Sequence, residues 1–190
     1  MRIGIDIDDT IVYTNKVLKN EAKKYNAKIL NNRKIKNHNS KLVEDKYDWT
    51  VAEKIDFLKY CVNKYYMNLE IKKDSKEIIN KLFNEGHEIY IVTYRTNECF
   101  GNAYDFCYTW LTNNDIKFTK LIVNRGDKGN VCKEENIDLF IDDRLENCID
   151  AIKNGSKAIL FDENKFYDTD LISVITWKEV EKIIGEMING

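Results

Sequence analysis

Short apolar runs alternate along this chain with longer segments whose apolar residues recur at helical spacing. The apolar runs, rich in Ile, Val, Leu and Phe, lie at residues 2–7, 88–93, 118–123, 138–141 and 157–161. The segments between them, such as 74–86, 99–113 and 145–154, have the three- and four-residue repeat of amphipathic helices. Parallel strands need crossover connections, which helices usually supply. The alternation therefore predicts an α/β fold, with a parallel sheet flanked by helices on both faces.

The first apolar run continues directly into a group of acidic residues. Residues 2–7 have the β-branched composition of a buried strand, and Asp6, Asp8 and Asp9 lie at its end. Three carboxylates buried so close together repel one another and lose solvation, unless a cation lies among them. Asp6 and Asp8 are two residues apart, so both face the same side of a strand. The segment alone is also typical of an acidic turn held by Thr10, so its interpretation needs the rest of the chain.

Two other predicted strands also end in polar side chains. The run at 88–93 ends in Thr93, and the run at 138–141 is followed by Asp142 and Asp143. Each has a plainer interpretation when taken alone, Thr93 as an ordinary strand-end hydroxyl and the two aspartates as a helix cap. In an open α/β sheet, however, ligands bind beyond the carboxyl ends of the strands. The three strand ends together predict one active site at that edge.

Phosphoryl transfer fits this set of side chains. A carboxylate nucleophile and a phosphate are both anions, so a cation has to lie between them. We expect Mg²⁺ in this position, held by Asp6, Asp142 and the backbone carbonyl of Asp8, because Mg²⁺ prefers oxygen ligands. Thr93 and the backbone amides near it are expected to donate hydrogen bonds to the phosphate.

The basic residues beside these motifs complete the predicted site. Arg95 lies two residues after the second strand end and is able to present a bidentate fork to a phosphate or sugar oxygen. Lys128 is our choice as the phosphate-binding lysine, because glycines in the loop 125–129 let the backbone approach a ligand. Lys133 is the alternative, and either lysine could instead be a solvated surface charge.

Residues 14–70 lie between the first strand and the next strand–helix unit and predict a small helical insertion. Helical spacing begins near Tyr13 and again at Thr50, where Thr50 and Glu53 form a capping-box pattern. The polar stretch 27–48 between these helices predicts a long loop or mobile lid. The predicted domains are therefore a core of residues 1–13 and 71–190 and an insertion of residues 14–70. Aromatic side chains in the insertion are expected mostly to pack its interior, with Tyr47 and Trp49 as the better candidates for stacking on a ligand.

Composition excludes several classes of function. The chain has 190 residues, a net charge of −2 and no concentrated basic patch, which argues against binding to a nucleic acid polymer. It has no apolar run of the length needed to cross a bilayer and no N-terminal signal pattern, so we expect a cytoplasmic protein without a membrane partner. The five cysteines are odd in number and none form a C-x-x-C pair, which favours reduced thiols. A monomer and a homodimer both fit.

The motifs Asp6-x-Asp8-x-Thr10, Thr93, Lys128 and Asp142-Asp143 resemble, in this order, the four motifs of the haloacid dehalogenase superfamily. The resemblance implies a Rossmann-like core with a helical cap. It also implies Mg²⁺ as cofactor, Asp6 as nucleophile and Asp8 as general acid and base, while Thr10 steadies the turn. Asp9 departs from the pattern, since many of these phosphatases carry glycine there.

Within the superfamily, Lys128-x-x-x-Cys132, the run 137–143 and the segment 176–179 resemble the cytosolic 5′(3′)-deoxyribonucleotidase-like (type C) family and its bacterial relatives. This resemblance implies a phosphatase acting on a small phosphate ester, with a (deoxy)nucleoside monophosphate as the expected substrate. The alternatives are a phosphatase of a small sugar or polyol phosphate and a non-catalytic regulator with the same fold. A regulator would have no need to tolerate the repulsion among so many acids.

Overall fold

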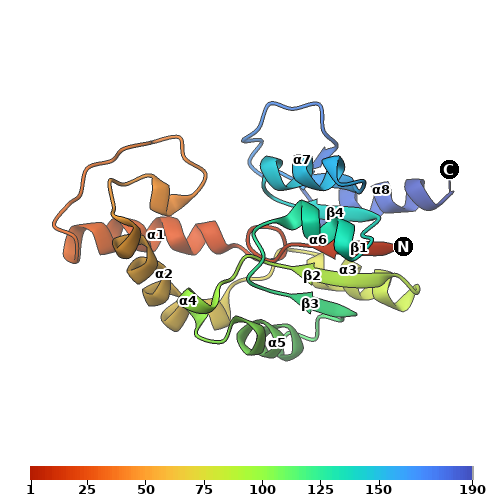
Figure 1. The fold of residues 1–190 in the computed structure, drawn as a ribbon, viewed down its shortest axis with the longest axis horizontal. Coiled ribbons are helices and arrows are strands. Elements are labelled where there is room, and N and C mark those ends of the chain that lie inside the picture. Colours follow the sequence, from red (N-terminus) through yellow and green to blue (C-terminus); the bar gives the residue numbers. More distant parts are fainter. Residues whose placement is uncertain (190) are drawn as a thin grey trace.

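A parallel sheet forms the centre of the part of the chain that the computed structural model describes, residues 1–189 (Figure 1). Its six strands have the order β3-β2-β1-β4-β5-β6, and every neighbouring pair is parallel. The strands are β1 (Arg2–Ile5), β2 (Glu88–Val92), β3 (Lys120–Ile122), β4 (Leu139–Asp142), β5 (Lys157–Phe161) and β6 (Ser173–Val174). The predicted α/β class with a parallel sheet is confirmed.

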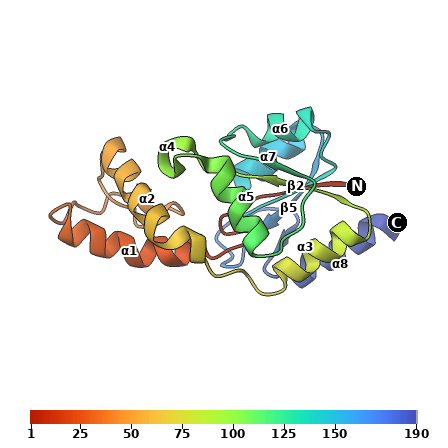
Figure 2. The same cartoon turned by 90° about the horizontal axis from the view of Figure 1, so that it is seen from below.

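Helices cover both faces of the sheet (Figure 2). One face carries α6 (Lys128–Glu134) and α7 (Leu145–Lys153), which pack against each other. The opposite face carries α3 (Ser75–Asn84), α5 (Ala103–Asn113) and α8 (Trp177–Asn189). The second face buries the larger apolar core, in which the rings of Trp110 and Trp177 are fully enclosed. No helix in the described part of the chain is both long and apolar enough to span a membrane.

Some local predictions are wrong, and each has a physical reason. Helix α6, which begins at Lys128, is missing from the predicted elements because it is too short to show a clear repeat. Strand β6 was missed because it has only two residues. Asp74 and Glu77 have the spacing of a second capping box, which predicts a cap for α3, but Asp74 has a φ of 65° and its side chain makes no capping hydrogen bond. The box at Thr50 and Glu53 is confirmed by two reciprocal hydrogen bonds of 2.7 and 3.2 Å.

Residues 14–70 form a helical lobe that lies beside the sheet, at the left in Figures 1 and 2. The lobe contains α1 (Thr14–Lys28), η1 (Val43–Asp45), α2 (Val51–Tyr65) and η2 (Tyr66–Asn68). Its two connections to the core run antiparallel at Val12 and Ile71, with the amide of Lys72 donating to the carbonyl of Ile11 at 2.7 Å. Such a two-segment connection fits a separate cap domain, which stays a prediction.

Aromatic rings fill the interior of the helical lobe. The Trp49 ring stacks on Tyr47 at 4.8 Å and packs against Tyr25 and Phe57, and its indole N–H donates to Asn26 at 2.8 Å. Trp49 is 6% exposed. The expectation that Trp49 stacks on a ligand is therefore wrong, because the interior of the lobe covers its ring.

Strand β1 contains one position, Gly4, where only a glycine fits. A Cβ atom on Gly4 would lie 2.8 Å from a ring carbon of Phe140 and 3.2 Å from Ile137. Both neighbours are buried in the smaller apolar core under α6 and α7. Because Gly4 has no side chain, β1 and β4 can pair while the Phe140 ring lies against them.

We expect Gly4→Ala to lower the free energy of unfolding by about 1–3 kcal/mol, because overpacking forces buried neighbours to move. Urea unfolding would measure the change. Gly185→Ala is the matched control, since a Cβ there meets no atom within 4 Å and α8 gains a better helix former. Unchanged stability of Gly4→Ala would show that Phe140 adjusts freely.

Candidate active site

The predicted nucleophile and a predicted metal ligand meet at the carboxyl edge of the sheet. Asp6 follows β1, and Asp142 ends the neighbouring strand β4. The amide of Asp6 donates to the carbonyl of Ile141 at 3.0 Å, which sets the two carboxylates side by side. Asp6 is 4% exposed and Asp142 is fully buried. The charges of these two acids therefore have to be balanced within the protein.

Lys128 supplies the balancing charge. Its ammonium Nζ lies 2.5 Å from Oδ1 of Asp6 and 2.6 Å from Oδ2 of Asp142. Burial alone lowers the pKa of Lys128, but the charges of Asp142 and Asp6 outweigh this effect and raise it. Burial raises the pKa of Asp6 well above its usual value, while Lys128 acts in the opposite direction. Lys133, the alternative lysine, is exposed on α6 and forms no ion pair within the described residues.

Asp142 has further partners that hold it in place. The backbone amide of Arg144 donates to Oδ1 at 2.8 Å, and Nδ2 of Asn147 lies 3.0 Å from both carboxylate oxygens. Asn147 lies in the first turn of α7. Asn147 was not predicted, although its position five residues after Asp142, at the start of the predicted helix 145–154, is a usable sequence signal.

Asp8 lies beside this pair and has different partners. The guanidinium group of Arg95 binds both of its carboxylate oxygens at 2.9 Å, and the hydroxyl of Thr14 donates to Oδ1 at 2.6 Å. Burial raises the pKa of Asp8, but the charge and hydrogen bonds of Arg95 outweigh it, so the pKa falls below the usual value. Arg95 therefore lies at the site with its fork directed at Asp8, whereas the sequence predicted a phosphate or sugar oxygen as its partner.

Thr93 also lies at this edge and is 1% exposed. Its amide donates to the carbonyl of Ile122, and its hydroxyl accepts a 3.4 Å hydrogen bond from the amide of Arg95. Thr10 is fully buried, and its hydroxyl has no hydrogen-bond partner among the described residues. The carbonyl of Thr10 instead accepts from the indole of Trp177 at 2.9 Å, which ties the turn to α8.

The backbone explains why an aspartate can replace the usual glycine at position 9. Asp9 has a φ of 58°, in the left-handed region that aspartate tolerates better than most residues. Its carboxylate accepts from the amide of Asn15 at 2.9 Å and so caps the start of α1. Burial, together with the charge of Asp143, raises the pKa of Asp9 to about 7.

Besides Thr14, a second side chain of the helical lobe reaches the core acids. The ammonium of Lys41 donates to the backbone carbonyl of Asp143 and pairs with its carboxylate at 2.9 Å. It also lies 4.6 Å from the centre of the Tyr167 ring. Burial and the charge of Asp142 raise the pKa of Asp143 to about 6, against the effect of Lys41. The sequence contains no signal for this contact, which joins the predicted lid loop to the core.

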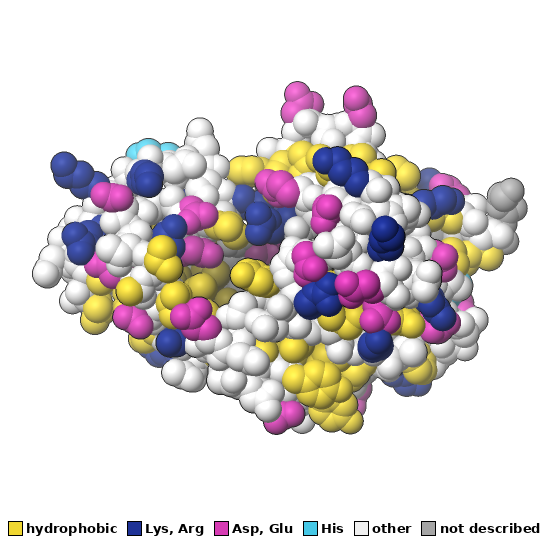
Figure 3. All heavy atoms as spheres, in the orientation of Figure 1, with side chains coloured by type: hydrophobic (Ala, Val, Ile, Leu, Met, Phe, Trp, Pro, Cys, Tyr) yellow, Lys and Arg dark blue, Asp and Glu magenta, His cyan; other side chains and the backbone are white. Residues whose placement is uncertain are grey.

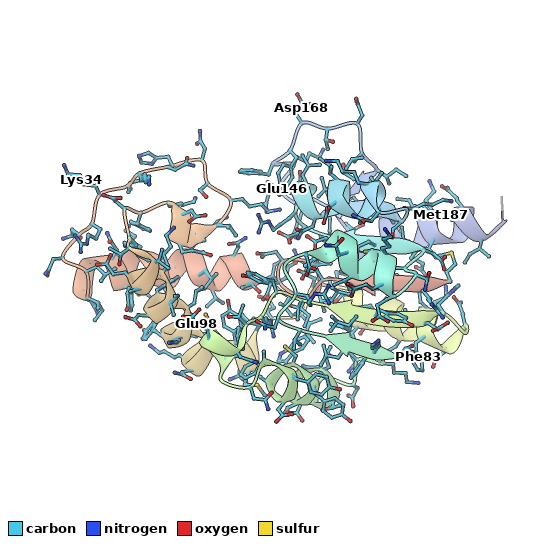
Figure 4. All side chains as sticks on the ribbon, in the orientation of Figure 1. Lys34, Phe83, Glu98, Glu146, Asp168 and Met187 are labelled. Carbon is cyan, nitrogen blue, oxygen red and sulfur yellow. The ribbon has the colours of Figure 1, made fainter. Side chains whose placement is uncertain are left out.

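The surface between the lobe and the core is hollowed on the face drawn in Figure 3, and acidic, basic and apolar side chains meet there. In Figure 4, Lys34 marks the outer part of the loop that leads to Lys41, and Asp168 marks the loop that carries Tyr167. Glu98 lies on α4 (Asn97–Phe100), which packs against α2 of the lobe. The lobe therefore contacts the core near the strand ends that carry the site.

Among the described residues, no three His, Cys, Asp or Glu side chains are arranged as a ready metal site. Two carboxylates, those of Asp6 and Asp142, converge on a single nitrogen atom. The side chain of Asp8 is bound to Arg95, so its predicted contribution to a metal would come from the backbone carbonyl. All three donors are hard oxygen atoms, which fits Mg²⁺ in chemistry.

Comparison with solved structures identifies the fold. A haloacid dehalogenase-like hydrolase from Streptococcus pneumoniae superimposes with a TM-score of 0.67 at 13% identity, covering 96% of this chain and 97% of that one. A predicted phosphoglycolate phosphatase from Haemophilus somnus gives 0.66 at 14% identity, with the same coverage. A HAD hydrolase from Bacillus subtilis, bound to magnesium, gives 0.59 at 14% identity, covering 97% and 98%. The chain has the haloacid dehalogenase fold, as the sequence predicted.

Sequence comparison adds a distant relative. A nucleotidase from Clostridium acetobutylicum is 27% identical over 128 residues, which make up 65% of this chain. The matched part spans 64% of that relative's length. No family model matches the sequence.

We expect Lys128→Met to lower the free energy of unfolding by about 3–5 kcal/mol in a buffer without divalent cations, because two buried carboxylates lose their counter-charge. Lys133→Met, the control on the exposed side of the same helix, should stay within about 0.5 kcal/mol of the wild type. Chemical unfolding of both variants would test this. Equal effects of the two substitutions would contradict the assignment of Lys128 as the lysine of the site.

Proposed function

We propose that this protein is a Mg²⁺-dependent phosphomonoester hydrolase that forms a phospho-aspartyl intermediate on Asp6. The observation that carries the proposal is the convergence of Asp6 and Asp142 on the Lys128 ammonium at the carboxyl edge of the sheet. Two buried acids and a lysine in this position form a polarised site for an anionic ligand. The haloacid dehalogenase fold supports the same chemistry.

Mg²⁺ is the proposed cofactor. Asp6 and Asp142, with the backbone carbonyl of Asp8, are the residues that would hold it. Because both carboxylates contact one nitrogen atom, their oxygens are close enough to contact one cation. Bound Mg²⁺ would neutralise charge where an anionic phosphate meets an anionic nucleophile. The magnesium-bound neighbour from Bacillus subtilis supports this proposal at the level of fold.

The residues of this chain have distinct proposed roles in the reaction. Asp6 attacks phosphorus, and its own bond to phosphorus forms as the bond to the leaving oxygen breaks. Asp8 gives a proton to the leaving oxygen and later removes one from the water that hydrolyses the intermediate. Lys128 and Thr93 bind the phosphate oxygens. Lys128 also favours the ionised form of Asp6, against the burial that raises its pKa.

The proposed substrate is a small-molecule phosphate ester, and a (deoxy)nucleoside monophosphate is the leading choice. Its support is the motif resemblance and the nucleotidase from Clostridium acetobutylicum. A small sugar or polyol phosphate is the second choice, and the structural likeness to a predicted phosphoglycolate phosphatase supports a small phosphate ester that is not a nucleotide. We propose that the helical lobe acts as the cap over the bound substrate.

Asp6→Asn should lower the hydrolysis of p-nitrophenyl phosphate about a thousandfold or more, because an amide cannot act as the nucleophile. Asp115→Asn is the control, since its carboxylate is 83% exposed in the loop before β3. EDTA should abolish the wild-type activity, and Mg²⁺ should restore it. Released phosphate measures all three effects, and an active Asp6→Asn variant would exclude the mechanism.

A panel of phosphate esters tests the substrate class. We expect kcat/KM for nucleoside monophosphates to exceed that for sugar and polyol phosphates by about tenfold or more, which corresponds to 1.4 kcal/mol of extra transition-state binding. Matched pairs of ribose and deoxyribose nucleotides would report the preference at the sugar. Higher kcat/KM values for glycerol or hexose phosphates would favour the second choice and reject the first.

A further inference from the structure

Two hydrogen bonds hold the guanidinium group of Arg95 against the carboxylate of Asp8. Its Nε donates to Oδ2 of Asp8 and its Nη2 to Oδ1, both at 2.9 Å. The Arg95 side chain is 2% exposed and the Asp8 side chain is 30% exposed, so the guanidinium group is shielded from water while the carboxylate stays partly open. A bidentate arginine–carboxylate pair fixes the plane of the carboxylate as well as its position. The contact therefore determines how Asp8 is oriented.

Aromatic rings from three elements enclose the guanidinium group. Its central carbon lies 5.2 Å from the Tyr66 ring of η2, 5.5 Å from the Phe100 ring of α4 and 5.9 Å from the Trp110 ring of α5. The remaining terminal nitrogen, Nη1, lies 4.0 Å from the thiol sulfur of Cys107. To reach a phosphate, Arg95 would have to leave both this enclosure and Asp8. Its geometry points to a role through Asp8.

The partners of Asp8 leave one of its two oxygens less occupied than the other. Oδ1 accepts from both Arg95 and the Thr14 hydroxyl, whereas Oδ2, among the residues that the structure describes, accepts only from Nε of Arg95. An ionised carboxylate has about four acceptor sites, two on each oxygen. Three of them are therefore filled, and the open site is on Oδ2.

We propose that Arg95 is the positioning residue of Asp8 and, together with Thr14, restricts proton exchange to Oδ2. This inference rests on the proposed phosphatase function. In the first step the proton on Oδ2 moves to the leaving oxygen as its bond to phosphorus breaks, which releases an alcohol. In the second step water attacks phosphorus, the bond between Asp6 and phosphorus breaks, and a proton of the water returns to Oδ2. The sum is an ester plus water giving an alcohol plus phosphate.

The dependence of the rate on the leaving group tests this role. An alkoxide needs a proton to leave, whereas p-nitrophenolate leaves without one. Arg95→Met should therefore lower kcat/KM for glycerol phosphate about a hundredfold, the size of a typical general-acid contribution, and that for p-nitrophenyl phosphate less than about fivefold. Asp8→Asn should show the same selectivity. The double variant should lose little beyond Asp8→Asn, because the two residues act as one unit.

Two further measurements separate positioning from phosphate binding. Inhibition by inorganic phosphate should be unchanged in Arg95→Met, and Arg95→Lys should restore part of the glycerol phosphate activity. Equal losses on both esters, or weaker inhibition by phosphate, would overturn the proposal and indicate a phosphate ligand. Losses that add in the double variant would overturn it as well.

Thr14→Val covers the case in which Arg95→Met does not fold. This substitution removes the hydroxyl that binds Oδ1 and keeps the shape of the side chain. We expect a smaller loss with the same selectivity for glycerol phosphate, and an equal loss on both esters would overturn the proposal. If the wild type hydrolyses neither ester, the proposed function itself fails, which is a different outcome.

Discussion

The structure depends on one buried arrangement of charge, the Lys128 ammonium between Asp6 and Asp142. Taking a carboxylate out of water costs several kcal/mol unless an opposite charge and hydrogen bonds replace the solvent. The two acids end neighbouring strands at the centre of the sheet, where no water is available to Asp142. Lys128 and Asn147 supply the missing partners. The arrangement holds two acids in a defined geometry at the place where the fold binds ligands.

The other acids of the site are balanced in the same way, by cations from different elements. Asp8 pairs with Arg95 from the segment after β2, and Asp143 pairs with Lys41 from the helical lobe. The ion pair between Lys41 and Asp143 therefore joins the lobe to the acidic edge of the sheet, in addition to the two chain connections. The aromatic ring of Tyr66, at the end of the lobe, covers Arg95 from the other side. Through these contacts, the groups that surround Asp8 depend on where the lobe lies.

Much of the site was predictable because its motifs lie at strand ends. Asp6, Thr93 and Asp142 each follow an apolar run, and parallel strands bring such ends to one edge whatever the loops do. Lys41 was not predictable, because a polar loop has no periodicity that indicates where one lysine will lie. The direction of the Arg95 fork was also open, since a guanidinium group can bind a phosphate or a carboxylate equally well.

The sequence by itself determined the fold class, the order of the strands along the chain and the acids at their ends, because apolar periodicity and strand-end residues are local features. Only the tertiary structure decided which basic side chain pairs with which acid. Lys128 rather than Lys133 lies between the acids because the first residue of α6 points at β1 and β4, while Lys133 faces solvent. Such pairings are made between segments far apart in the chain, so they depend on how the sheet, the helices and the lobe pack together.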